Sequence, residues 1–174
     1  MYNSIIQFIE KDTKKIENFV KENLLSGNMM RFEESLLDTM LELGRSLYQE
    51  ILESIEETIK NSEFRKQNYY VEHKEDQRTL LTRFGNIEIK RAYYTPKCGG
   101  KGIYLLDKYV GIDNNDKVSQ AALAHALKEA VETSYRKGGE EACLTEDNIT
   151  KQTVKKLIHG INVEMSEEIP EKNK

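Results

Sequence analysis

The strongest constraint on the fold is a run of apolar residues that recur every three or four positions between Met29 and Glu63. The run consists of Phe32, Leu36, Met40, Leu43, Leu47, Ile51, Ile55 and Ile59. This spacing places one apolar side chain per turn along the same side of an α-helix. At 1.5 Å per residue the helix would extend on the order of 50 Å, longer than a small domain is wide, so its apolar stripe requires a partner.

An antiparallel helix is one available partner. Residues 3–25 carry a second, incomplete helical stripe, and Ser26-Gly27-Asn28 interrupts it before the long helix begins. We therefore expect residues 1–77 to form a long N-terminal helical hairpin that serves oligomerisation. A second copy of the chain could cover the rest of the stripe, which predicts a homodimer through the long helix. The alternative is that the helical hairpin and the central segment suffice.

The period changes from helical to alternating in RTLLTRFGNIEIKRAYYTP, which begins at Arg78. Alternation of polar and apolar residues is typical of a half-buried β-strand, and Gly85-Asn86 supplies the positive-φ residues of a tight turn. Pro96 ends the second strand because it has no N–H to donate to a ladder. Residues 78–115 are therefore expected to form a central β-hairpin followed by a glycine-rich loop.

Basic and aromatic side chains decorate this β-hairpin. Arg83, Lys90 and Arg91 lie on the expected strands, and Tyr93 and Tyr94 follow directly. A two-stranded ribbon of this composition suits contact with phosphates and stacking on bases. Alternatively, the tyrosines pack on the sheet and the arginines are merely exposed.

Charge is distributed unevenly along a chain whose net charge is −4. Residues 1–77 carry 10 basic and 16 acidic side chains, residues 78–117 carry 8 and 4, and residues 118–174 carry 8 and 10. A protein that is basic throughout is therefore excluded. The positive charge is concentrated in the middle of the chain and on its last helix.

Residues 116–162 are expected to form three short helices. Together with the helical hairpin and the β-hairpin, they predict a mainly helical α+β protein. Asp116 can cap the first helix, and Ser134 can cap a second that runs to Cys143. Three short helices that end in a basic one resemble a helix-turn-helix DNA-binding unit. Gly138-Gly139 departs from that pattern, because two glycines inside a helix cost roughly 2 kcal/mol relative to two alanines.

The last helix would expose a basic face. Asn148 or Thr150 can cap it, and the connection before it is longer than the three or four residues of a strict helix-turn-helix. Its outward side chains are Lys151, Gln152, Lys155 and Lys156. The lysines suit phosphate contacts and the glutamine can read a base edge, so we expect DNA contact here first and at Arg83, Lys90 and Arg91 second. The alternative is a solvated charged face without a ligand. Residues 163–174 form a polar tail.

No pattern of residues predicts catalysis, a metal site or a cofactor. The carboxylates and histidines form no recognisable constellation, and the glycine-rich loop KCGGK lacks the spacing of a phosphate-binding loop. Cys98 has no second cysteine or histidine nearby, so the sequence predicts no zinc site there. Cys98 and Cys143 lack the pattern of a disulfide scaffold, and the N-terminus is neither a signal peptide nor a membrane span. We therefore expect a cytoplasmic protein without a membrane partner.

Four segments in this order, TRFGNIEIKRAYY, KCGGKGIYLLDKYVGI, SYRKGGEEA and NITKQTVKKLIHGI, resemble the N-terminal part of bacterial insertion-sequence transposases of the ISLre type. Members are also catalogued as an uncharacterised protein family. The resemblance implies DNA binding at the element ends and assembly of a transposase complex. It assigns strand cutting to an RNase H-like domain downstream of the matched region, so no residue here is expected to be catalytic.

The resemblance thus predicts a DNA-binding and assembly region without enzymatic activity, and suggests a truncated copy. The alternative is a helical protein–protein interaction module with no DNA role, whose long stripe is the active surface. A self-sufficient nuclease would need a clustered acidic metal site, which the sequence does not indicate.

Overall fold

The computed structural model describes residues 2–23, 28–113 and 116–160. The expected end of the first helix at Leu25, the break at Ser26-Gly27 and the polar tail 163–174 lie outside these residues.

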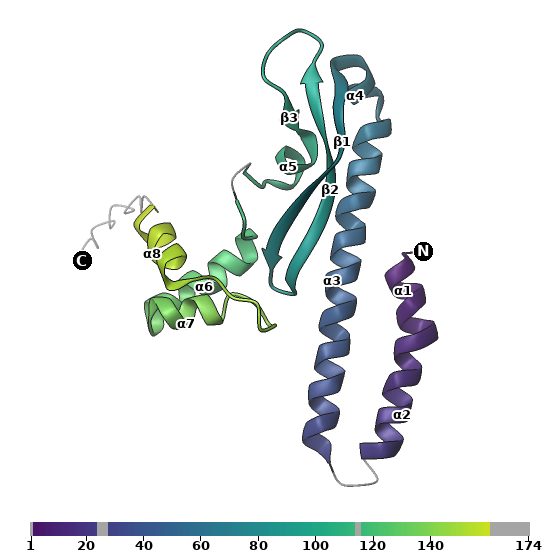
Figure 1. The fold of residues 1–174 in the computed structure, drawn as a ribbon, viewed down its shortest axis with the longest axis vertical. Helices are drawn as coiled ribbons and strands as arrows, with labels where there is room; N and C mark the ends of the chain where they lie inside the picture. Colours follow the sequence, from purple (N-terminus) through teal and green to yellow (C-terminus); the bar gives the residue numbers. More distant parts are fainter. Residues whose placement is uncertain (1, 24–27, 114–115, 161–174) are drawn as a thin grey trace, which may run out of the picture.

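Two antiparallel helical segments form the N-terminal part (Figure 1). The first comprises α1 (Asn3–Gln7), a π-helical turn η1 (Phe8–Asp12) and α2 (Thr13–Asn23), and the second is α3 (Met29–Asn61). Asn28 caps α3 by accepting from the Arg31 N–H, and the Ser4 hydroxyl donates to Glu50 Oε2 at 2.7 Å. The expected helical hairpin and its long second helix are confirmed.

A three-stranded antiparallel sheet of order β1-β2-β3 follows the short helix α4 (Glu63–Asn68). The strands are β1 (Tyr69–Thr82), β2 (Gly85–Pro96) and β3 (Ile103–Tyr104), so β1 begins well before the alternating segment at Arg78. Its first half escapes the pattern because the register shifts between Val71 and His73 and again before Asp76. The β-hairpin is confirmed, and β3 is an addition.

The β1–β2 turn differs from the expected one. Thr82 pairs with Gly85, so Arg83 and Phe84 form the turn, and Asn86 already belongs to β2. Only Gly85 of the predicted turn pair has a positive φ, at 97°. The Thr82 hydroxyl stabilises this arrangement, because it accepts from the Phe84 N–H at 3.1 Å and donates to the Gly85 carbonyl at 2.8 Å.

The core lies between α3 and the sheet. Its buried members are Leu52, Leu80, Ile87, Ile89 and Leu106. Half-buried side chains of α3 pack against them, among them Tyr48 and, from the apolar stripe, Ile55 and Ile59. Leu106 comes from α5 (Leu105–Val110), which follows β3 directly. The C-terminal part of the long apolar stripe, around Ile55 and Ile59, thus has its partner within the chain.

A buried cluster of charges fixes α5 to the sheet. Asp107 is 4% exposed and pairs with two arginines, with Arg78 Nη1 at 2.6 Å and with Arg91 Nη1. Arg78 also donates to the carbonyls of Asp113 and Asp116. Arg91 lies over the Tyr104 ring, 3.6 Å from its centroid. Burial lowers the pKa of both guanidinium groups, and the shared carboxylate offsets that cost.

Glu56 of α3 is a second buried carboxyl. Its Oε1 accepts from the Tyr94 hydroxyl at 2.5 Å and from the Ala92 N–H at 3.2 Å, which ties α3 to β2. Burial raises the pKa of this carboxyl, although both hydrogen bonds act in the opposite direction. The folded protein therefore holds the Glu56 proton at pH values where the unfolded chain has released it.

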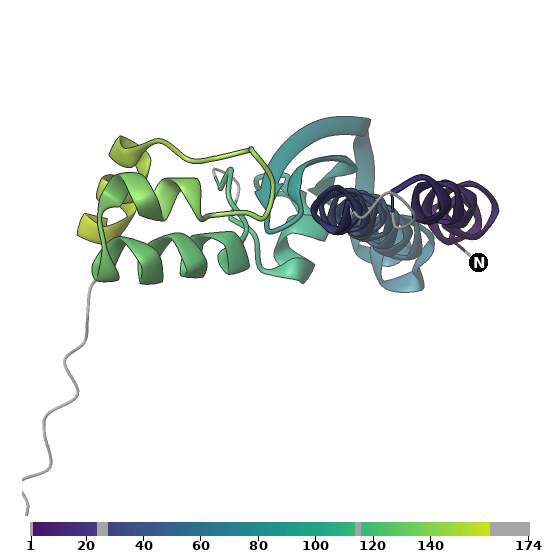
Figure 2. The same cartoon turned by 90° about the horizontal axis from the view of Figure 1, so that it is seen from below.

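Three helices complete the chain: α6 (Gln120–Glu132), α7 (Tyr135–Glu140) and α8 (Lys151–Gly160). Ser119 caps α6 by accepting from the Ala122 N–H at 3.3 Å, so the expected cap at Asp116 is wrong. Ser134 caps α7 as expected, but α7 ends at Glu140 and not at Cys143. The three helices and the helical hairpin lie on opposite sides of the strands (Figures 1 and 2). None of the helices in the described part combines the length and hydropathy of a membrane crossing.

Replacing Asp107 by asparagine tests the charge cluster. Asp107→Asn keeps the side-chain shape but leaves two buried guanidinium groups without their carboxylate, so we expect the free energy of unfolding to fall by about 3–5 kcal/mol. Urea unfolding at pH 7 measures it. Asp113→Asn is the matched control, because Asp113 is exposed and only its carbonyl contacts Arg78; we expect a change within about 0.5 kcal/mol. Equal effects of the two substitutions would contradict the assignment.

Glu56 predicts a specific pH dependence. Because its pKa in the folded state lies above the usual 4.5, its contribution to stability is complete below pH 4.5 and is lost as the pH rises through the folded pKa. Glu56→Gln removes this titration, so the unfolding free energy of the variant relative to wild type should increase between pH 5 and pH 8. Glu57→Gln is the control, since the exposed Glu57 has a lowered pKa and should produce no such increase.

Candidate nucleic-acid interface

The two glycines in α7 permit close helix packing. A Cβ at Gly138 would lie 2.4 Å from the Ala126 carbonyl oxygen, and a Cβ at Gly139 would lie 2.1 Å from the Ile149 carbonyl oxygen. The facing residues of α6 are also small, namely the buried Ala122, Ala126 and Ala130. Gly138-Gly139 is thus a packing requirement of the three-helix unit, and its helix-propensity cost accompanies a close contact.

The same contact positions the start of α8. The Ile149 N–H donates to the Gly139 carbonyl at 3.2 Å. Thr150 then caps α8, because its hydroxyl accepts from the Thr153 N–H at 3.2 Å. Val154 is fully buried and lies against Gly139. The orientation of α8 therefore depends on α7.

The three-helix unit is joined to the β-hairpin at two places. Near its beginning, the Leu81 N–H donates to the Lys117 carbonyl at 2.9 Å, and the Ser119 N–H donates to the Leu81 carbonyl at 2.8 Å. In the loop before α8, Asn86 Nδ2 donates to Asp147 Oδ1 at 2.8 Å. The sequence predicts Asn86 as a turn residue and gives no role to Asp147. Their separation of 61 positions leaves no local signal for the contact.

Arg83 belongs to the second junction. Its Nη1 donates to the carbonyls of Glu141 at 2.7 Å and Ala142 at 3.1 Å, and its own carbonyl accepts from the Leu144 N–H at 2.9 Å. Arg83 therefore holds the loop against the β-hairpin turn. In this arrangement it is a positioning residue for the α8 unit.

α8 brings together the four residues that were expected first for DNA contact. Lys151, Gln152, Lys155 and Lys156 are all exposed. At 100° per residue Gln152 and Lys156 lie opposite Val154, and Lys151 and Lys155 lie beside them on one flank of the helix. Within the described residues none of the three lysines forms an ion pair. The exposed His159 in the last turn adds a further nitrogen donor on that side.

The β-hairpin does not provide the second basic face that its sequence indicated. Arg91 is buried in the Asp107 cluster, so it is unavailable to DNA and the expectation for it is corrected. Tyr94 is fully buried, and the Tyr93 ring packs on Tyr104 with centroids 4.9 Å apart. Lys90 alone of the three hairpin residues is exposed, beside a cavity of about 180 Å³ whose lining includes four glutamates. The tyrosines pack on the sheet, and the basic face is limited to α8.

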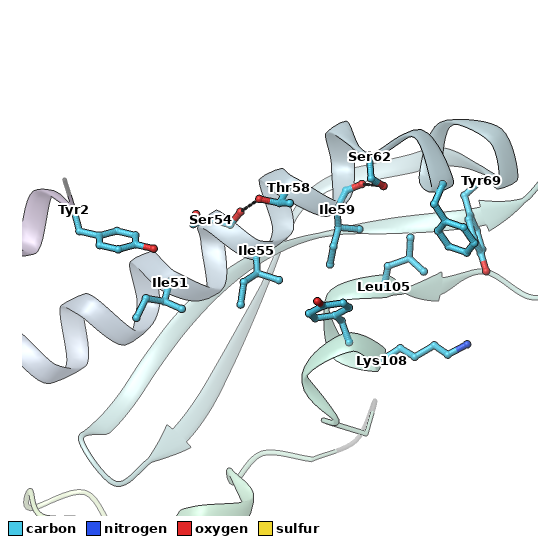
Figure 3. A pocket seen from close by; sticks show the side chains of 12 residues that line it. Tyr2, Ile51, Ser54, Ile55, Thr58, Ile59, Ser62, Tyr69, Leu105 and Lys108 are labelled. Carbon is cyan, nitrogen blue, oxygen red and sulfur yellow. Dashed lines mark hydrogen bonds between the residues drawn. The ribbon is translucent and has the colours of Figure 1, made fainter.

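An apolar groove of about 720 Å³ runs along α3 (Figure 3). Ile51, Ile55 and Ile59 form its floor, and Tyr2 and Leu105 lie along its sides. Two of its hydroxyl groups bond to the helix backbone, since the Thr58 hydroxyl donates to the Ser54 carbonyl and the Ser62 hydroxyl to the Ile59 carbonyl. The groove thus offers an apolar surface and no acid–base pair. Across the part of the chain that the structure covers, no three His, Cys, Asp or Glu residues converge on a metal position.

The packing of α7 reverses the usual effect of a Gly→Ala substitution in a helix. Propensity alone would stabilise a helix by roughly 1 kcal/mol, but Gly139→Ala forces its Cβ into the Ile149 carbonyl. We expect thermal unfolding at a lower temperature, with a loss of about 1–3 kcal/mol. Lys137→Ala in the same helix is the control and should be nearly neutral. A stabilised Gly139→Ala variant would show that α7 and the 149–150 segment are not in contact.

Comparison with known proteins places the chain in a family. The model for an uncharacterised protein family, UPF0236, matches residues 21–174. A UPF0236 protein of Caldanaerobacter subterraneus subsp. tengcongensis is 32% identical over 170 residues, which are 97% of this chain and 36% of that relative. Another from the same organism is 36% identical over 131 residues, 75% of this chain and 28% of that relative.

The chain spans about a third of the length of these curated relatives. No solved structure matches it. The family match over most of the chain leads to one conclusion: the chain belongs to the uncharacterised protein family UPF0236.

Proposed function

We propose that the chain binds DNA through α8 and is the DNA-binding and assembly region of an insertion-sequence transposase. The observation that carries the proposal is the exposed side of α8, where Lys151, Gln152, Lys155 and Lys156 lie together. Buried Val154 on the opposite side anchors the helix. A helix with this division of faces can enter the major groove and keep its apolar side on its own unit.

The lysines and the glutamine would have different roles. Lys151 and Lys155 are one turn apart, as are Gln152 and Lys156, so two parallel rows face outward. Lysines would contact phosphates and supply affinity without sequence information, whereas the amide of Gln152 can pair with an adenine edge. The connection between α7 and α8, residues 141–150, is longer than a helix-turn-helix turn. The proposal therefore concerns a helix-turn-helix-like unit.

The transposase part of the proposal has separate support. It comes from the resemblance of four ordered segments to ISLre-type transposases, which extends from the β-hairpin to α8. In the structure, Arg83 of the first segment contacts Glu141 and Ala142 of the third, and Asn86 contacts Asp147, which directly precedes the fourth. The proposed role is DNA binding and assembly, and it includes no strand-cutting step.

A protein–protein interaction module without a DNA role is the second candidate. It is favoured by the exposed apolar residues on the lower part of α3, among them Leu37 and Met40. The two candidates differ in one measurable property, because only the first requires affinity for a duplex that falls with salt.

Fluorescence anisotropy with two labelled duplexes tests the proposal. One duplex carries the DNA that flanks the gene of a longer relative, where the proposal places the end of the element, and the other is its shuffled version. We expect tighter binding to the flanking sequence. We also expect the logarithm of the binding constant to fall linearly with the logarithm of the salt concentration. Lys155→Ala/Lys156→Ala should weaken binding to both duplexes and reduce the salt slope by about 1.8, if each lysine neutralises one phosphate. Gln152→Ala should reduce the preference between duplexes.

The matched control is Lys11→Ala/Lys14→Ala, which removes the same charge from exposed positions of the N-terminal helix. Its binding should equal that of wild type. Equal losses in both double variants would indicate a general charge effect. Absence of binding at 20 mM salt would refute the DNA role and leave the interaction module.

A further inference from the structure

The helical hairpin leaves an apolar surface uncovered on one of its sides. Six side chains on it are between 37% and 68% exposed. They are Tyr2, Ile6 and Ile9 from the first helical segment and Met30, Leu37 and Met40 from α3. We call this set the open face.

The α3 residues of the open face extend the apolar side of the helix that covers the sheet. At 100° per residue, Met30 and Leu37 lie on the same side of α3 as Ile55, which packs against the core. The β-hairpin turn, however, ends beside the middle of α3, where the Phe84 ring adjoins Gly44 (Figure 1). Below Gly44 the same side of the helix extends past the sheet.

The first helical segment contributes to the same side. Tyr2 lines the apolar groove together with Ile51 and Ile55 of α3, which places it on the side of α3 that faces the sheet (Figure 3). Ile6 and Ile9 follow Tyr2 at intervals of four and three residues, so they share its helix face. The two antiparallel helices thus present one joint apolar surface.

This part of the molecule lacks a closed core of its own. Among residues 2–22 and 28–45, whose burial the structure describes, only Ser4, Asp12 and Leu41 are buried, and Leu41 alone is apolar. A helix buries its stripe by packing against a second layer, and two helices side by side are a single layer. The helical hairpin therefore requires a further layer over the open face.

We propose that the open face is a dimer interface and that its occupant is a second copy of this chain. The area supports this occupant. Exposed fractions of this size correspond to roughly 550 Å² per copy and about 1,100 Å² in total, which reaches the lower limit of a specific interface. Two identical two-helix layers placed face to face about a twofold axis form a four-helix bundle, in which the same residues meet from both sides.

Sedimentation equilibrium of the chain without DNA tests the dimer. We expect a mass of about 40 kDa, twice the 20.2 kDa of one chain, at micromolar concentrations. Leu37→Glu/Met40→Glu places two carboxylates per copy in the interface and should raise the dimer dissociation constant at least about 30-fold. Val131→Glu is the control, because Val131 is exposed on α6, away from the open face, and should leave the constant unchanged. Far-ultraviolet circular dichroism establishes that each variant retains its helices.

Disulfide trapping gives a second test that does not depend on a disruptive variant. Leu37→Cys in a Cys98→Ser background should form a covalent dimer on mild oxidation, and Val131→Cys in the same background should not. A wild-type chain that stays monomeric at 100 µM, or an unchanged dissociation constant in Leu37→Glu/Met40→Glu, would overturn the proposal. Because these measurements contain no DNA, Lys155→Ala/Lys156→Ala should dimerise normally, and failure of the DNA role would leave this result intact.

Discussion

The shared carboxylate of Asp107 is the interaction on which the rest of the structure depends. Two guanidinium groups from different strands meet on it, and that of Arg78 also donates to the carbonyls of Asp113 and Asp116. The cluster therefore connects β1, β2, α5 and the chain that leads into α6. Buried charges of this kind favour one arrangement of the chain more than they add stability. A register of β1 shifted by one position would turn Arg78 to the opposite face of the sheet, away from Asp107.

Position relative to this cluster separates the structural parts from the proposed functional ones. α3 and the sheet enclose the apolar core, whereas α8 lies on the far side of the strands, attached by backbone hydrogen bonds and by Arg83 and Asn86. Lys151, Lys155 and Lys156, which are exposed and form no ion pair within the described residues, are on that attached unit. A helix that is already fixed in place by the rest of its unit loses little conformational entropy when it binds a ligand.

Local periodicity predicted the long helix, the β-hairpin and the exposed side of α8, because each of these patterns is written in neighbouring residues. The sequence was less informative about the basic residues of the hairpin. Lys90 and Arg91 are adjacent, yet one is exposed and the other is buried. Alternation along β2 places Arg91 on the face of buried Ile87 and Ile89, but its partner there, Asp107, lies 16 residues later. Gly138-Gly139 was equally ambiguous, since its reason lies in Ala126 and Ile149. Contacts between distant segments leave no periodic signal.

The two junctions of the three-helix unit lie close together on the β-hairpin, at Leu81 and at Arg83 to Asn86. A unit fastened near the tip of a two-stranded ribbon turns with that ribbon, and antiparallel ribbons have a strong right-handed twist. The angle between α8 and α3 is therefore a property of the hairpin backbone. In a symmetric dimer built on α3, the twist of the hairpin would set the distance between the two α8 helices and their relative orientation. It would therefore set the spacing of two binding sites that both helices could contact at the same time.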